Sequence, residues 1–117
     1  MEVTRMSAPL GAVVEGVDVR SLDDGVFEEI NQLFCEHHVL VFPKQNLRPN
    51  DQIKFANRFG ELIPFPYMAL QDYPNLIELS NKGKARDVNQ HWHSDMTYHE
   101  QPPKLTMLYA LEAPEIG

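Results

Sequence analysis

The spacing of apolar residues changes along this chain, and that change limits the folds that the chain can adopt. Between residues 26 and 37 the apolar side chains recur at helical intervals, at Val26, Phe27, Ile30, Leu33 and Phe34. This spacing places them on one face of an amphipathic helix. Asp23 or Asp24, in the turn just before, can cap its first turn. The sequence therefore predicts a helix over 26–37 that faces a core.

Elsewhere the apolar residues form short runs that favour strands. Val39–Phe42 is continuously apolar and stops at Pro43, which predicts a buried strand. The valine-rich stretch 12–19 predicts a strand with a glycine irregularity. Residues 76–79 and 105–111 predict two further strands.

A second short helix is predicted from about Gln52 to Phe59, opened by 47–51 and ended by Gly60. Prolines within 63–67 require an extended loop there, and the polar stretch 81–90 predicts an exposed loop. Two early helices among several strands do not give the strict alternation of a parallel α/β fold. The predicted fold class is therefore mainly β with flanking helices.

Composition limits the class of protein further. The chain has 117 residues, enough for one domain or a piece of one, and a net charge of -7 argues against nucleic acid as a partner. No apolar run approaches the ~20 residues that span a bilayer, and the N-terminus lacks the apolar core of a signal peptide. The single cysteine, Cys35, cannot form an internal disulfide, which favours a cytoplasmic protein. Because 114–117 follow a predicted strand directly, we expect the chain to be the N-terminal part of something longer.

The tripeptide His93-Ser94-Asp95 is the strongest candidate for a functional site. Residues two apart on a strand point to the same side, so this imidazole and carboxylate can converge on one metal ion. Two histidines and one carboxylate are the ligands of non-haem Fe(II) oxygenases. The tripeptide also occurs in solvated turns, and His91 with His93 forms a second pair that suits Zn(II), Mn(II) or Fe(II). Local chemistry alone leaves these alternatives open.

Five blocks of sequence, in order, resemble the taurine/2,4-dichlorophenoxyacetate dioxygenases, which use Fe(II) and 2-oxoglutarate. The resemblance covers nearly the whole chain, although Pro43-Lys44 replaces the more usual Arg-Asp. The blocks are Leu10–Arg20, His38–Gln45, Asp51–Leu62, Trp92–Pro103 and Ala113–Gly117.

The resemblance implies a double-stranded β-helix, or jelly roll, with helices packed outside it. Residues 1–117 would be the N-terminal part of a single dioxygenase domain, truncated before the fold is complete. It implies that His93 and Asp95 bind iron. Asn89 matches an asparagine that hydrogen-bonds substrate, although a loop-capping role is an equal alternative. We assign no catalytic or cofactor-binding residue, because the family's second iron histidine and its 2-oxoglutarate-binding arginine lie beyond Gly117.

The function implied is dioxygenation of a small organic acid or sulfonate by Fe(II), 2-oxoglutarate and O₂. The expected partners are a small-molecule anionic substrate and further copies of the chain in a homo-oligomer, with no membrane. Trp92 is expected to pack its ring against the barrel and hold His93 in register.

Two alternatives to this function remain. The first is an inactive truncated fragment with open sheet edges. The second is a small cupin-like metal protein that uses His91, His93 and Glu100. The sequence assigns no role to His99.

Overall fold

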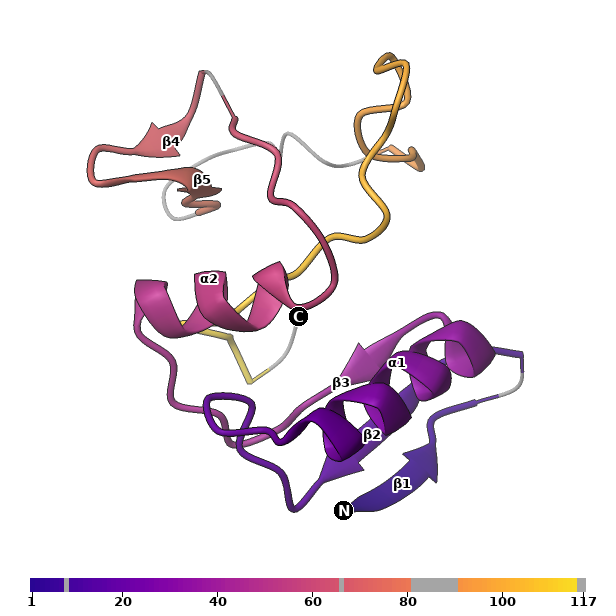
Figure 1. Ribbon diagram of the computed structural model, residues 1–117. Coiled ribbons are helices and arrows are strands. Elements are labelled where there is room, and N and C mark those ends of the chain that lie inside the picture. The colour runs from indigo at the N-terminus through magenta and orange to yellow at the C-terminus, as the bar shows by residue number, and fades with distance from the viewer. Residues whose placement is uncertain (8, 66, 81–90, 116–117) are drawn as a thin grey trace. The chain divides into compact units, whose positions relative to one another are not determined.

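The computed structural model describes residues 1–7, 9–65, 67–80 and 91–115, which fall into two compact units, Met1–Phe59 and Gly60–Gly117. Its elements in order are β1 (Glu2–Arg5), β2 (Ala12–Glu15), α1 (Asp24–His37), β3 (Leu40–Val41), α2 (Pro49–Asn57), β4 (Ala69–Leu70) and β5 (Tyr73–Ile77). The first unit holds β1 to α2 and the second holds β4 and β5 (Figure 1). Within the described residues, none of the helices has the length and apolar character needed to cross a membrane.

The first unit is built on a three-stranded sheet in the order β1-β2-β3. β1 pairs with β2 antiparallel, from Glu2 opposite Glu15 to Arg5 opposite Ala12. β3 pairs with β2 in parallel, with Ala12 opposite Leu40. Parallel neighbours need a crossover connection, and α1 supplies it as it packs along the sheet (Figure 1). The sequence did not predict β1, whose four residues are all exposed and carry no burial pattern.

Helix α1 confirms the predicted amphipathic helix and begins two residues earlier, at Asp24. The Asp23 side chain accepts a hydrogen bond of 2.9 Å from the Val26 N–H, so the predicted cap is formed. The helix ends where His38 turns left-handed, with φ of 63°, and its N–H donates to the Phe34 carbonyl at 2.8 Å. Ile30, at the middle of the helix, is completely buried.

The core of the first unit consists of small aliphatic residues from the sheet and aromatic rings from the helices. The buried apolar residues of the described chain are Ala12, Val14, Val19, Ile30 and Phe55. Phe59 makes edge contacts with three other rings, with centroids 4.9, 5.4 and 6.4 Å away, in Phe27, Phe55 and Phe34. Each aromatic pair of this kind adds about 0.5–1.5 kcal/mol of stability beyond the burial of its apolar area. Because Phe59 contacts rings of both helices, this cluster joins α1 to α2.

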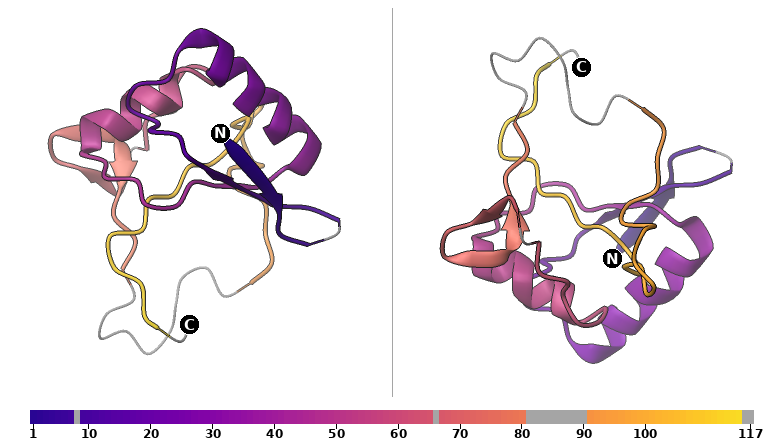
Figure 2. Two further views of the ribbon diagram at one scale, coloured as in Figure 1. Left: turned by 90° about the horizontal axis from the view of Figure 1, so that it is seen from below. Right: turned by 90° about the horizontal axis from the view of Figure 1, so that it is seen from above.

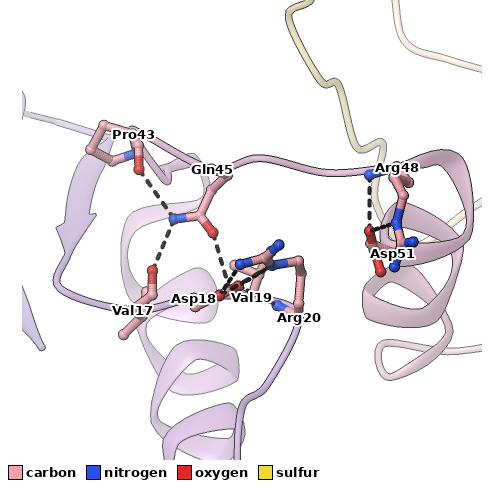
Figure 3. Close-up of polar contacts among 8 residues, drawn as sticks. All are labelled: Val17, Asp18, Val19, Arg20, Pro43, Gln45, Arg48 and Asp51. Carbon is pink, nitrogen blue, oxygen red and sulfur yellow. Dashed lines mark hydrogen bonds and ion pairs between the residues drawn. The ribbon is translucent and has the colours of Figure 1, made fainter.

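Gln45 joins the segments that follow β2 and β3 (Figure 3). Its Nε2 donates to the Val17 carbonyl at 2.9 Å and to the Pro43 carbonyl at 3.1 Å. Its Oε1 accepts the Val19 N–H at 3.1 Å. One half-buried amide therefore satisfies three backbone groups that sheet pairing leaves over.

Two ion pairs lie close to this junction. Arg20 donates to both Asp18 oxygens, with Nη2 at 2.6 Å, and these bonds lower the pKa of Asp18 to about 2. Arg48 donates its backbone N–H to Asp51 at 2.9 Å, which lowers the pKa of that carboxyl. The second contact closes the first turn of α2, where Pro49 needs no N–H donor of its own.

The predicted strand at 39–42 is shorter and less buried than the sequence indicates. Only Leu40 and Val41 pair in β3, and Val41 remains 40% exposed. In the described residues β3 is an edge strand, with β2 on one side and no strand on the other, so its apolar side chains are incompletely covered. The strand predicted over 12–19 also ends early, at Glu15, because Gly16 adopts a left-handed φ of 75°. The second helix is confirmed, within three residues of each predicted end.

The second unit contains a hairpin in which β4 and β5 are antiparallel, seen in both further views (Figure 2). Ala69 faces Ile77 and Leu70 faces Tyr73, with an irregularity between the two pairs. The predicted strand over 76–79 overlaps β5 only at its first two residues. The Pro74 carbonyl accepts the Phe65 N–H at 3.1 Å, so the preceding loop lies against the hairpin.

The strand predicted over 105–111 is not formed in the structure. Its side chains alternate as a strand requires, because Leu105, Met107 and Tyr109 are half-buried whereas Thr106 and Leu108 between them are exposed. A strand also needs a hydrogen-bonded neighbour, and the described residues place none beside it. The described chain is therefore a set of small sheets with two helices, and a jelly roll is not seen in these residues alone.

Candidate metal centre

His93 lies two residues before a turn of the second unit, and Asp95 is the first residue of that turn. The sequence predicts an extended, β-prone segment here, and that prediction is wrong: residues 95–98 form a turn. Met96 adopts a left-handed φ of 51°, and its carbonyl accepts the His99 N–H at 3.0 Å. The turn reverses the chain immediately after the two candidate ligands.

The two candidate ligands nevertheless lie close together. Nε2 of His93 lies 3.2 Å from Oδ1 of Asp95. Both side chains are about half exposed, at 48% and 49%, so the pair opens to solvent. The convergence that the sequence suggested is present, although the two residues lie in no strand of the described structure.

The other ring nitrogen of His93 is held by the backbone. Nδ1 lies 2.7 Å from the carbonyl oxygen of His91. A carbonyl oxygen can only accept, so Nδ1 carries the proton and the neutral ring leaves Nε2 as an acceptor. In that form Nε2 faces a carboxylate oxygen, and a cation bound between these two atoms would interact favourably with both. Such an arrangement suits a cation-binding pair.

Asp95 has a second polar neighbour that the sequence did not indicate. The Thr106 hydroxyl donates to Oδ2 of Asp95 at 2.8 Å, leaving Oδ1 toward His93. Thr106 is eleven positions further along, within a mostly apolar run, where a hydroxyl gives no signal by itself. Only the fold of the second unit brings the two side chains together.

A cavity of about 490 Å³ lies beside this turn, within the second unit. Its walls are mostly apolar and aromatic, and none of the described residues that line it is Lys or Arg. They are Ile63, Pro64, Phe65, Tyr67, Met96, Tyr98 and His99. Met96 and Tyr98 belong to the turn that begins at Asp95, so this turn supplies part of the cavity wall, and the centroid of the His99 ring lies 4.9 Å from that of Tyr98. Tyr67 is 89% exposed, which leaves the cavity open to solvent.

The other residues that the sequence analysis singled out do not join His93 and Asp95 in the described structure. Asn89 lies outside the described residues. Trp92 is fully exposed, so the expectation that its ring packs and holds His93 in register is wrong; the His91 carbonyl orients His93 instead. Among the described residues, no three His, Cys, Asp or Glu side chains gather into a metal site. The cupin-like alternative built on His91, His93 and Glu100 is therefore not assembled there.

Comparison with known proteins relates this geometry to a family. The family model described as "Taurine catabolism dioxygenase TauD, TfdA family" matches residues 2–117. An alkylsulfatase of Acinetobacter baylyi is 32% identical over 119 residues, which is all of this chain and 37% of the relative. An (S)-phenoxypropionate/alpha-ketoglutarate-dioxygenase of Sphingobium herbicidovorans is 33% identical over 99% of this chain and 42% of its own length. The chain thus spans less than half the length of these two relatives.

A solved structure is similar as well. The crystal structure of AAD-2 in complex with Mn(II) and N-oxalylglycine matches with a TM-score of 0.51 and 27% identity. The match covers 53% of this chain and 23% of that protein.

Proposed function

This chain belongs to the TauD, TfdA family of taurine catabolism dioxygenases, and we propose that it contributes to an Fe(II)- and 2-oxoglutarate-dependent dioxygenase. The family resemblance of the sequence is thereby confirmed. Bound iron would supply the oxidising chemistry, in which 2-oxoglutarate and O₂ give succinate and CO₂ while the substrate gains a hydroxyl group. The residues of this chain would hold the iron and shape the space beside it.

The observation that supports this proposal most directly is the contact between Nε2 of His93 and Oδ1 of Asp95 at 3.2 Å. Two donor atoms each about 2.1 Å from one metal ion, at right angles, lie ~3.0 Å apart. The observed separation suits neighbouring ligands of one ion. The Nδ1 contact with the His91 carbonyl leaves Nε2 free for the metal, an arrangement common among metal-binding histidines.

A complete site of this type needs one more histidine, and the described residues bring no third ligand to the pair. We propose that a histidine elsewhere in the enzyme completes it, that Asn89 contacts substrate, and that 1–117 form part of one dioxygenase domain with a jelly-roll fold. No residue of this chain is assigned to bind 2-oxoglutarate.

The cavity supports a small organic acid or sulfonate as substrate. Its apolar and aromatic walls suit the hydrocarbon portion of such a molecule. The chain's relatives are named for phenoxypropionate and alkyl sulfate chemistry, both of which join a hydrocarbon group to an anionic one. The anionic group would have to be bound outside the cavity walls described here, since they carry no Lys or Arg.

Metal binding by single-residue variants of the enzyme that contains this chain and the third histidine tests the proposal. His93→Ala and Asp95→Ala should each weaken Fe(II) binding, measured by anaerobic titration, and abolish succinate release coupled to a panel of sulfonates and aryloxy acids. His91→Ala and Glu100→Ala are matched controls. They remove exposed side chains from the same loop, and His91→Ala keeps the backbone carbonyl that contacts His93.

The outcomes separate the alternatives. Unchanged iron binding in both His93→Ala and Asp95→Ala would refute the site. Equally weakened Fe(II) binding in His91→Ala and His93→Ala would favour His91 and His93 as the metal-binding pair. Tight binding by the unmodified protein without coupled succinate would favour an inactive metal-binding chain over a dioxygenase.

A further inference from the structure

We infer that Thr106 is a positioning residue for Asp95: its hydroxyl fixes the terminal torsion of the carboxylate, so that one oxygen is presented to the metal. The inference rests on the proposed metal site, because it assigns a role beside it. Thr106 touches neither the imidazole of His93 nor the cavity; its described contact with the site is the 2.8 Å bond to Oδ2 of Asp95.

The two oxygens of Asp95 have different partners. Oδ1 faces Nε2 of His93 at 3.2 Å, whereas Oδ2 accepts from Thr106 at 2.8 Å. The terminal torsion of an aspartate is broad, so a carboxylate with no second contact can rotate out of the orientation in which one oxygen faces the imidazole. The hydroxyl of Thr106 binds one oxygen and thereby restricts this rotation, which keeps the other oxygen beside the imidazole.

The position of the Thr106 hydroxyl is itself determined by the run that carries it. Leu105 and Met107 are half-buried, and Thr106 between them is exposed, so the alternation of the run directs Thr106 to the opposite side. A β-branched side chain also has restricted χ1 rotation. The donor is therefore held by its backbone and does not have to be ordered by the metal.

The half-exposed setting limits the size of the effect. Water reaches both His93 and Asp95, so it can replace part of a lost hydrogen bond. Partners that orient metal ligands nevertheless typically contribute about 10–100-fold to metal affinity. We expect a loss of about tenfold, at the lower end of that range, when the hydroxyl is removed.

The test compares Mn(II) binding, by electron paramagnetic resonance titration, in four variants and the unmodified protein. Thr106→Val removes the hydroxyl and keeps the side-chain shape, Thr106→Ser keeps the hydroxyl, and Asp95→Ala removes the proposed ligand. Thr97→Val is the matched control, since Thr97 is an exposed threonine in the same unit. Thermal melting by circular dichroism verifies that each variant is folded.

Support requires about tenfold weaker Mn(II) binding and an altered bound-Mn(II) spectrum in Thr106→Val, with Thr106→Ser and Thr97→Val close to the unmodified protein. If Thr106→Val binds normally while Asp95→Ala does not, the role of Thr106 is refuted and the metal site stands. Equal losses in Thr106→Val and Thr106→Ser would also refute it, because the hydroxyl would then not matter. Normal binding by Asp95→Ala would refute both the metal site and the role of Thr106.

Discussion

Nε2 of His93 lies 3.2 Å from Oδ1 of Asp95, although Asp95 begins a turn and neither residue lies in a strand of the described structure. The left-handed Met96 that follows and the carbonyl of His91 that precedes define this local arrangement. The pair is therefore formed largely by the backbone from 91 to 96. It does not depend on how the two units are placed.

The first prediction concerns the protonation of His93 in the metal-free protein. Because Nδ1 donates to the His91 carbonyl at 2.7 Å, the neutral ring should carry its proton on Nδ1. Two-dimensional ¹H–¹⁵N correlation of the imidazole nitrogens, at a pH where the ring is neutral, measures this directly. His99 in the same spectrum is an internal comparison. A dominant Nε2–H form of His93 would contradict the arrangement and weaken the case for Nε2 as a ligand.

The second prediction concerns the stability of the first unit. Gln45→Leu removes the partners of two carbonyls and one N–H, and should cost about 1–3 kcal/mol of unfolding free energy. Gln45→Glu keeps an acceptor for Val19 but places an oxygen against two carbonyls, so it should also destabilise at neutral pH.

Gln32→Leu is the control, because Gln32 is an exposed glutamine of α1. Denaturant unfolding of the three variants provides the comparison. Equal stability of Gln45→Leu and Gln32→Leu would show that water replaces the three hydrogen bonds of Gln45 without loss.

Much of the first unit could be predicted because its signals are local. The apolar residues from Val26 to Phe34 recur at helical spacing, and Asp23 caps the helix through the N–H of Val26, three positions away. β1 and β4 were missed because four exposed residues and a two-residue strand carry no periodic burial. Each of them pairs with the next strand along the chain, so the missing signal was the burial pattern and not the separation of the partners.

In the candidate site, contacts between residues close in the sequence could be predicted and contacts between distant residues could not. His93 and Asp95 are two positions apart, so their proximity could be anticipated even though the strand was wrong. Thr106 could not be anticipated, because its contact with Asp95 depends on a chain reversal over eleven positions. Trp92 was expected to pack because large aromatic rings usually do, and its full exposure depends on neighbours that the local sequence does not specify.

The third prediction concerns pH. Hydrogen bonds from the Arg20 side chain, then from its backbone N–H, lower the pKa of Asp18 from 3.8 to about 2. The folded value lies below the unfolded one, so the contribution to stability is complete above pH 3.8 and is lost as the pH falls through about 2.

Titration of the Asp18 carboxyl carbon by NMR should therefore give a midpoint near 2, which moves toward the ordinary value in Arg20→Gln. Because the pair is about half exposed, added salt should raise the midpoint as well. A midpoint that does not respond to Arg20→Gln would show that the ion pair is absent in solution.

The fourth prediction uses Trp92, the only tryptophan of the chain and the residue directly before His93. Its full exposure means that acrylamide should quench its fluorescence about as efficiently as it quenches a free indole. Trp92→Phe should change the free energy of unfolding by no more than about 0.5 kcal/mol, as is usual for exposed positions.

The same residue can report on metal binding. If His93 binds metal, paramagnetic Mn(II) should strongly quench the fluorescence of Trp92. His93→Ala should abolish that quenching, whereas His91→Ala should retain it. Diamagnetic Mg(II) controls for ionic strength. A ring shielded from acrylamide, together with a large loss of stability in Trp92→Phe, would show that Trp92 packs in solution and that the exposed position is wrong.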